Sequence, residues 1–92
     1  MIILSGHISV PESELAKIRE ALPKHIAATR AEAGCIVFNV QENETEIGRF
    51  EVYEEFTDKK AFQCHQERVR QSDWGAVTKN VIRHYTVTGL ED

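Results

Sequence analysis

The stretch from residue 32 to residue 65 constrains the fold of this chain more than any other. It runs from a helix end through two strand-like segments, 35–42 and 47–56, which are separated by acidic and polar residues. Asp58 then begins a second helix, and His65 follows about two turns later. Adjacent strands joined by a short polar turn pair antiparallel. The stretch therefore predicts a β-hairpin followed by a helix that holds an ionisable side chain over it.

The segment before this stretch reads as a strand and a helix. Residues 2–10 partly alternate, with Ile2, Leu4, Ile8 and Val10 on one parity, which predicts a strand. Pro11 begins a helix that extends to about residue 33, and Pro23 predicts a kink or break near its middle. Gly34 is predicted to end it in the left-handed conformation. The apolar stripe of this helix consists of Leu15, Ile18, Leu22 and Ile26.

The segment after the hairpin reads as a helix, a connection and a strand. Thr57 or Asp58 is predicted to cap a helix over 58–70, and residues 72–80 form a linker or a fresh helical turn. Residues 81–90 alternate as a last strand. The inward stripe of the helix consists of Ala61, Phe62, His65 and Val69.

The predicted order β-α-β-β-α-β is typical of an α+β fold, the ferredoxin-like fold with an antiparallel sheet, formed by one domain over 1–92. Two helices cover one face of such a sheet and leave the other bare. The strands carry more apolar residues than we expect one helical layer to cover. This predicts a homodimer in which two bare sheet faces meet.

Composition excludes several classes of partner. The net charge is −4, and no Lys/Arg cluster is interleaved with aromatic residues, so nucleic-acid binding is not expected. No apolar run approaches the ~18 residues of a membrane span, and the N-terminus lacks the features of a signal peptide, so we expect a cytoplasmic protein. Cys35 and Cys64 are the only cysteines, and we interpret them as small buried hydrophobic residues rather than a disulfide.

His65 is the first candidate for a catalytic residue. It shares the inward stripe of its helix, and an imidazole exchanges protons near neutral pH. A core histidine bonded to a backbone carbonyl is the alternative. Glu54 falls on the parity of the apolar Phe50, Val52 and Phe56, where a carboxylate is costly unless it is paired or functional. It is expected to orient His65 or a substrate hydroxyl; a paired carboxylate at the sheet edge is the alternative.

Other residues are candidates for substrate contact. His7 and Asn39 lie in mid-strand and donate hydrogen bonds if they face the pocket, although solvent-facing positions suit them equally. Trp74 and Tyr85 are able to close a pocket over a flat ring, or to lie in the core. No metal is predicted, because Cys64 and His65 point about 100° apart on a helix. No nucleotide-binding motif is present either. The predicted substrate-binding set is Asn39, His7, Tyr53, Phe62 and Trp74.

The junction Gly34-Cys35, the strand 50–56, Asp58, Ala61 and His65 together resemble the antibiotic biosynthesis monooxygenase (ABM) family, which includes small quinol monooxygenases. The resemblance implies a dimeric α+β barrel with a hydrophobic pocket between sheet and helices. It also implies oxygenation without metal, flavin or haem, and it implies that Glu54 and His65 are functional residues. Phe56 stands where tryptophan is frequent in the family, and His7 stands where haem-degrading relatives use asparagine, which argues against haem degradation.

The resulting functional prediction is a cofactor-independent monooxygenase that acts with O2 on a quinol, a phenol or a polycyclic aromatic compound through the substrate anion. His65 is the base in this prediction, and Asn39 or His7 stabilises an oxyanion. Two other classes remain open on the same scaffold, an isomerase or lyase and a non-catalytic module that binds a small ligand. Haem binding through His65 or His7 is a further alternative.

Overall fold

A computed structural model describes residues 1–90 as four strands and three α-helices, with a short 3₁₀ turn over Glu12–Glu14 between the first strand and the first α-helix. The domain predicted over 1–92 therefore ends outside the described residues. No helix within the described part is long and apolar enough to cross a membrane. In chain order the elements are β1 (Ile2–Ser9), α1 (Leu15–Arg30), β2 (Cys35–Glu42), β3 (Arg49–Phe56), α2 (Lys59–Arg70), α3 (Asp73–Val77) and β4 (Ile82–Thr88).

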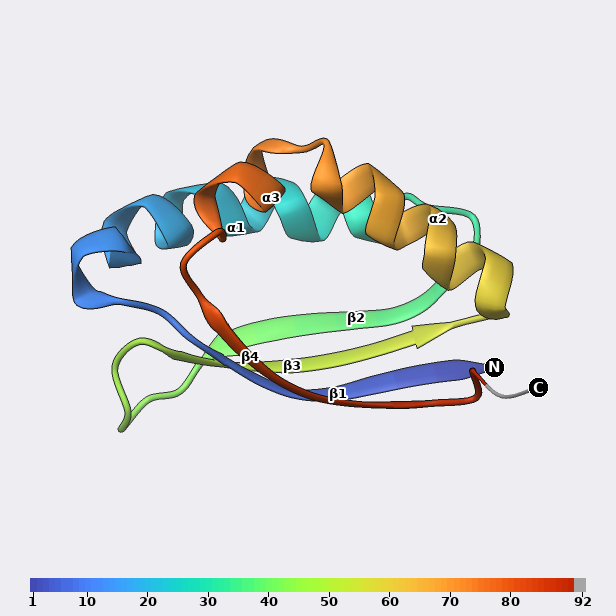
Figure 1. The fold of residues 1–92 in the computed structure, drawn as a ribbon, viewed down its shortest axis with the longest axis horizontal. Coiled ribbons are helices and arrows are strands. Elements are labelled where there is room, and N and C mark those ends of the chain that lie inside the picture. Colours follow the sequence, from blue (N-terminus) through green and yellow to red (C-terminus); the bar gives the residue numbers. More distant parts are fainter. Residues whose placement is uncertain (91–92) are drawn as a thin grey trace.

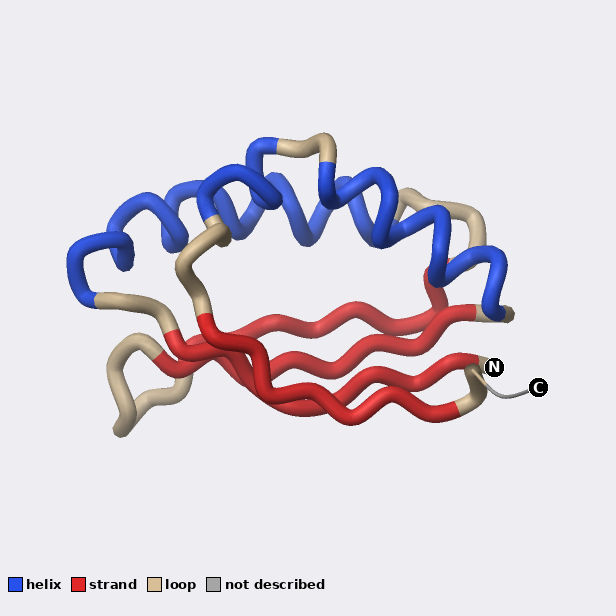
Figure 2. Tube along the Cα trace, in the orientation of Figure 1, coloured by secondary structure: helices blue, strands red, loops and turns tan. Residues whose placement is uncertain are grey.

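The strands form one antiparallel sheet in the order β2-β3-β1-β4. The helices lie together on one side of it, and no helix or strand of residues 1–90 lies on the other side (Figure 1). Figure 2 shows the same two layers, helices above and strands below. The predicted ferredoxin-like α+β fold is confirmed.

The sheet has one apolar face and one polar face. Ile2, Leu4 and Ile8 of β1 are buried, as are the residues of β3 that share their side, Phe50, Val52 and Phe56. These side chains form the core with the helices. The apolar parities of β1 and β3 face the helical layer, while Ile36, Ile82 and Tyr85 are exposed. The dimer predicted from apolar strand surface stays a prediction. The bare face carries mostly polar residues, including Ser5, His7, Asn39, Gln41, Arg49, Glu51, Glu55, Thr86 and Thr88.

The first helix departs from its prediction at two points. α1 continues through Pro23 without a break and ends at Arg30, three residues before the expected end. Ile18 and Thr29, on either side of the proline, are fully buried. We attribute the continuity of the helix to this anchoring, since proline removes only one backbone donor.

Gly34 does not adopt the predicted left-handed conformation. The glycines with positive φ among the described residues are Gly6, Gly48 and Gly89. At Gly34 a Cβ would lie 2.3 Å from the Cβ of Ala61, so the position requires glycine for space. This close approach brings the end of α1 and the start of α2 together.

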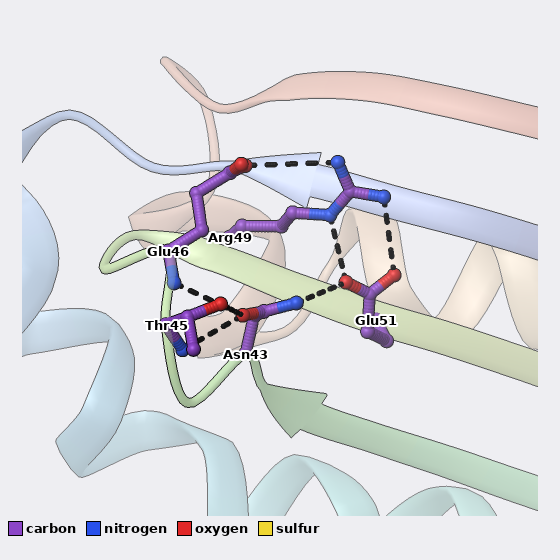
Figure 3. A network of polar contacts seen from close by, with 5 residues as sticks. All are labelled: Asn43, Thr45, Glu46, Arg49 and Glu51. Carbon is purple, nitrogen blue, oxygen red and sulfur yellow. Dashed lines mark hydrogen bonds and ion pairs between the residues drawn. The ribbon is translucent and has the colours of Figure 1, made fainter.

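The turn between β2 and β3 is held by side-chain contacts (Figure 3). The Asn43 side-chain oxygen accepts hydrogen bonds from the backbone N–H groups of Thr45 and Glu46, each at 2.9 Å. Its amide nitrogen donates to Glu51 at 3.1 Å, and Arg49 donates to the same carboxylate at 2.7 Å. The hairpin predicted from its polar turn is therefore fixed by its own polar residues.

The second helix begins as predicted, and the next segment resolves into a helix. The Asp58 carboxylate accepts a hydrogen bond from the backbone N–H of Ala61 at 2.8 Å and so caps α2. Of the two alternatives for residues 72–80, the structure contains the helical one, α3. Both cysteines are free thiols, but Cys64 is exposed and Cys35 half-buried, so the expectation that both are buried was wrong. Cys64 lies on the side of α2 that faces solvent.

Candidate functional site

Glu54 is a buried ionisable residue of the sheet that faces the core. It lies on β3 between Val52 and Phe56 on the helix side and is only 6% exposed. Its Oε1 atom has no hydrogen-bond partner among the described residues. Burial, reinforced by the charge of Glu32, raises the pKa of Glu54 to about 7. Glu54 therefore exchanges a proton near neutral pH.

His65 faces Glu54 from the helical layer. It projects from α2 toward the sheet and is 3% exposed. Its ring lies 4.8 Å from the ring of Phe56 and 5.7 Å from that of Phe38, measured between centroids. The Nε2 atom of His65 lies 3.8 Å from Oε1 of Glu54. The two groups are thus close enough to influence each other, but no hydrogen bond joins them at this distance.

Glu32 contacts the other nitrogen of the same ring. It follows α1, and its Oε1 lies 2.9 Å from Nδ1 of His65. Its Oε2 accepts a hydrogen bond from Nε of Arg68, whose Nη2 donates to Thr29 at 2.9 Å. Burial lowers the pKa of His65, the Glu32 carboxylate opposes this shift, and Arg68 adds to it. The lowered pKa keeps His65 neutral near pH 7, as a proton acceptor must be.

A second buried histidine adjoins this group. His25 of α1 stacks on Trp74 of α3, with ring centroids 4.7 Å apart and planes 6° from parallel. It lies edge-on to Phe38 and 6.2 Å from the ring of His65. Burial and the nearby His65 and Arg68 lower the pKa of His25 to about 3. His25 is therefore neutral at any physiological pH, and its buried Nδ1 has no partner among the described residues.

A groove of about 670 Å³ runs between α1 and the α2–α3 segment. His25, Trp74 and Arg68 line it, with small residues such as Ala21 and Ala28 from α1. Neither His65 nor Glu54 lines this groove or the two smaller ones described on the surface. His65 is packed among its neighbours, and the groove reaches only as far as His25.

The helix side of the sheet is open at its β4 edge. Tyr85 pairs with Gly6 of β1 and therefore points to the same side as Leu4 and Ile8, yet it is 37% exposed. Arg83 on the same side is also exposed. Burial and the charge of Glu54 raise the pKa of Tyr85 to about 12, so it remains a phenol that can donate a hydrogen bond. On the helix side of the sheet, Tyr85 and Arg83 of β4 therefore form a solvent-exposed edge.

The structure brings only some of the predicted site residues together. His65 and Glu54 face each other, and Phe62 packs against Phe56 next to them, with ring centroids 5.7 Å apart. Trp74 is buried on the same side of the sheet, against His25.

His7, Asn39 and Tyr53 lie on the opposite, bare face of the sheet. His7 stacks on His84 at 4.4 Å, Asn39 accepts a hydrogen bond from Arg30, and the Tyr53 hydroxyl donates to Glu55 at 2.5 Å. The sheet backbone separates them from His65. The predicted grouping of these three with His65 is therefore not present.

Four buried or half-buried residues of the site were not predicted from the sequence: Glu32, Arg68, His25 and Thr29. Two of them could have been found from the helical spacing. His25 and Thr29 lie seven and eleven residues after Ile18 and so fall on the same side of the helix. Glu32 and Arg68 carried none, because their contacts join segments more than 30 residues apart.

The arrangement is suited to proton transfer in an apolar setting. A neutral imidazole and a carboxyl group that titrates near pH 7 lie side by side, surrounded by aromatic rings. Within residues 1–90 no three His, Cys, Asp or Glu side chains are arranged to hold a metal ion.

Comparisons with known proteins agree with this architecture. The family profile described as "Antibiotic biosynthesis monooxygenase" matches residues 1–76. No curated protein matches the chain. A solved structure of a candidate antibiotic biosynthesis monooxygenase from Nitrosomonas europaea superposes with a TM-score of 0.79 at 18% identity, covering 96% of this chain and 94% of that one.

Two further solved structures are similar over nearly their whole length. A candidate antibiotic biosynthesis monooxygenase from Deinococcus radiodurans has a TM-score of 0.73 at 25% identity, covering 95% of this chain and 89% of that one. A conserved protein of unknown function from Bacteroides thetaiotaomicron has a TM-score of 0.78 at 21% identity, covering 94% and 93%.

Proposed function

Because this chain belongs to the antibiotic biosynthesis monooxygenase family, we propose that it is an oxidoreductase that transfers one oxygen atom from O2 to a quinol or phenolic ring, without metal, flavin or haem. The observation that carries the proposal is the buried pair formed by Glu54 and the Nε2 atom of His65, 3.8 Å apart. A base and an acid in apolar surroundings are what the activation of such a substrate needs.

The chemistry requires a base first and an acid later. Ground-state O2 is a triplet and reacts slowly with closed-shell molecules, but a phenolate or quinol anion can transfer one electron to it. Recombination of the two radicals forms a C–O bond as a peroxide. Cleavage of its O–O bond leaves one oxygen atom in the product and releases the other as water. For a quinol, the products are a hydroxyquinone and water, and the substrate supplies all the electrons.

The two residues divide these proton transfers. Nε2 of His65 takes the proton of the substrate hydroxyl, and the low pKa of the imidazole keeps this atom free to accept it. Glu54, with a pKa of about 7, returns a proton to the departing oxygen. Phe56 and Phe62 exclude water from the substrate anion, because solvation would stabilise this anion and slow its reaction with O2.

In this proposal the substrate enters over β4, where the helices leave the sheet uncovered. It meets the Tyr85 phenol first and Glu54 next, and it must separate the packed rings around His65 to reach Nε2. Trp74 would border the ring from the α3 side. His7, Asn39 and Tyr53 have no role here, because they lie on the other face.

Oxygen uptake tests the proposal. The purified protein is mixed with 1,4-naphthohydroquinone in an oxygen electrode, and the rate of autoxidation without protein is subtracted. We expect uptake that His65→Ala abolishes while its circular dichroism spectrum stays that of the parent protein. The matched control is His84→Ala, which removes an exposed imidazole from the bare face. With ¹⁸O2, one labelled atom should appear in the product. Full activity of His65→Ala would remove the proposed base.

The groove beside His25 favours a second candidate, a module that binds a flat ligand without converting it. Trp74 lines this groove, whereas the Glu54–His65 pair does not. Trp74 is also the single tryptophan, so its fluorescence reports binding directly. Quenching by the quinol with quantitative recovery of the unchanged ligand and no oxygen uptake would favour this candidate. A rearranged or cleaved product without oxygen uptake would instead indicate an isomerase or lyase.

A further inference from the structure

We infer that Glu32, held in place by Arg68, is a positioning residue for His65: it keeps the ring proton on Nδ1 and leaves Nε2 as the only acceptor, facing Glu54. The kinetic consequence rests on the proposed function, but the position of the proton does not. Glu32 contacts the Nδ1 side of the ring and Arg68 contacts Glu32, so both act through His65.

The geometry comes from the segment after α1, which lies beside α2. Glu32 lies one turn beyond Thr29 in this segment, and Arg68 lies one turn beyond His65 on α2. Gly34 permits this approach, because its missing Cβ leaves room for Ala61 at the start of α2. Glu32 is thus placed between the imidazole and the guanidinium.

The hydrogen bonds settle which groups donate. Oε2 of Glu32 accepts from Nε of Arg68, and the second arm of that guanidinium is held by the Thr29 hydroxyl. A carboxylate offers only acceptors, so the contact of Oε1 with Nδ1 of His65 at 2.9 Å requires a proton on Nδ1. In the neutral ring the other nitrogen, Nε2, then carries none and is directed at Glu54.

Four charged or titratable groups surround the imidazole. Glu32 faces it from the segment after α1, Glu54 from β3, His25 from α1 and Arg68 from its own helix. His25 stays neutral at physiological pH, and the charge of Glu54 raises the pKa of Tyr85 on β4. Only Glu32 both bonds to the ring and favours its protonated form. Removal of its charge therefore lowers the pKa of His65.

The variant Glu32→Gln makes the inference specific. The amide has a single acceptor oxygen, which accepts the hydrogen bond from Arg68, so its NH2 group faces Nδ1 of His65. This arrangement moves the ring proton to Nε2 and blocks the proposed base. An analogous swap of a buried carboxylate for its amide lowers kcat by about 10⁴ in serine proteases through the wrong tautomer. Here we expect kcat/KM to fall on the order of 10²–10³-fold.

The first measurement needs no activity. In protein labelled with ¹⁵N-histidine, two-bond ¹H–¹⁵N correlations give the tautomer of each of the four histidines, and His65→Gln identifies the signals of His65. We expect the proton on Nδ1 in the parent protein and on Nε2 in Glu32→Gln. A proton on Nε2 in the parent protein would overturn the inference, whether or not any variant folds.

The second measurement is the pH profile of kcat/KM for the quinol. The base acts when unprotonated, so the rate rises with pH through the pKa of His65. In Glu32→Gln this rise should move to lower pH, with a lower plateau. A merely structural role would lower the plateau without moving the rise. In Arg68→Gln the rise should instead move to higher pH, because the positive charge that lowers the pKa of His65 is removed.

Glu67→Gln is the matched control. Glu67 pairs with Arg70 on the exposed side of the same helix and contacts no histidine, so its removal should leave tautomer and profile unchanged. If the parent protein consumes no oxygen but carries its proton on Nδ1, the proposed function fails and the positioning by Glu32 stands. Glu32→Gln with an unmoved tautomer and kcat/KM within twofold of the parent would overturn the positioning role alone.

Discussion

Glu51 and Glu54 lie three residues apart on β3, on opposite faces of the sheet, and their environments drive them in opposite directions. Glu51, on the bare face, accepts hydrogen bonds from Arg49 and Asn43, which lower its pKa. Glu54, under the helices, has one oxygen without a partner and a pKa raised to about 7 by burial. The same side chain is a fixed anion on one face and a proton donor on the other.

The histidines show the same contrast. His7 and His84 stack on the bare face, and neither is buried. His65 and His25 are buried on the helix side, and burial lowers the pKa of both. Chemistry in this fold therefore depends on which face a residue occupies, more than on which residue types are present.

The largest difference between the two faces should appear in the pH dependence of stability. The folded pKa of Glu54, about 7, lies above its ordinary value of 4.5, so its contribution to stability is complete below pH 4.5 and is lost as the pH rises toward 7. The loss amounts to about 3 kcal/mol at 1.36 kcal/mol per pKa unit. Denaturant unfolding of the parent and of Glu54→Gln from pH 4 to 8 should show the parent losing this amount relative to the variant. For Glu51→Gln the difference in stability should have the opposite sign. The parent protein should gain stability relative to this variant as the pH rises, since the folded pKa of Glu51 is lowered. An unchanged difference between the parent and Glu54→Gln would show that Glu54 is solvated.

Activity should separate the same two glutamates. Glu54→Gln keeps the shape of the side chain but cannot return a proton to the departing oxygen, so kcat should fall on the order of 10²-fold. Glu51→Gln should stay within twofold of the parent. The measurement is oxygen uptake with the quinol at pH 7. Equal rates for the two variants would remove Glu54 from the mechanism while leaving the role of His65 to its own test.

The junction that supports the buried face can be tested by overpacking. Gly34→Ala places a methyl group 2.3 Å from the Cβ of Ala61. We expect a loss of about 2 kcal/mol in the free energy of unfolding, because a filled contact must be pushed apart. Ala61→Gly alone should cost about 1 kcal/mol in the helix, yet it should partly restore the double variant. A double variant with purely additive losses would contradict the direct contact.

The buried half of this comparison was predictable from the sequence. Alternation placed Glu54 among Phe50, Val52 and Phe56, and helical spacing placed His65 on the inward side of α2. Both positions follow from periods of two and 3.6 residues, which are local properties.

The sides of His7 and Asn39 were not predictable in the same way, although Tyr53 shares the parity of Glu51 and Glu55, which indicates the solvent face. Alternation separates two parities within a strand, but it does not say which parity the helices cover when both contain polar residues. The contact of Glu32 with His65 could not be predicted from the sequence at all. It depends on how closely the segment after α1 approaches α2. Gly34 permits that approach, but a single glycine produces no periodic pattern in the sequence.

The smallest effect should come from the bare face. His84→Thr removes an exposed ring from β4, next to other threonines, and we expect a cost of less than about 0.5 kcal/mol in dilute protein. The dimer expected through this face would bury His84 against a second copy, so the cost should then grow with protein concentration. Thermal unfolding at micromolar and millimolar protein measures both regimes, and sedimentation equilibrium gives the assembly state. A cost that is the same at every concentration would leave this face uncovered in solution and place any dimer contact elsewhere.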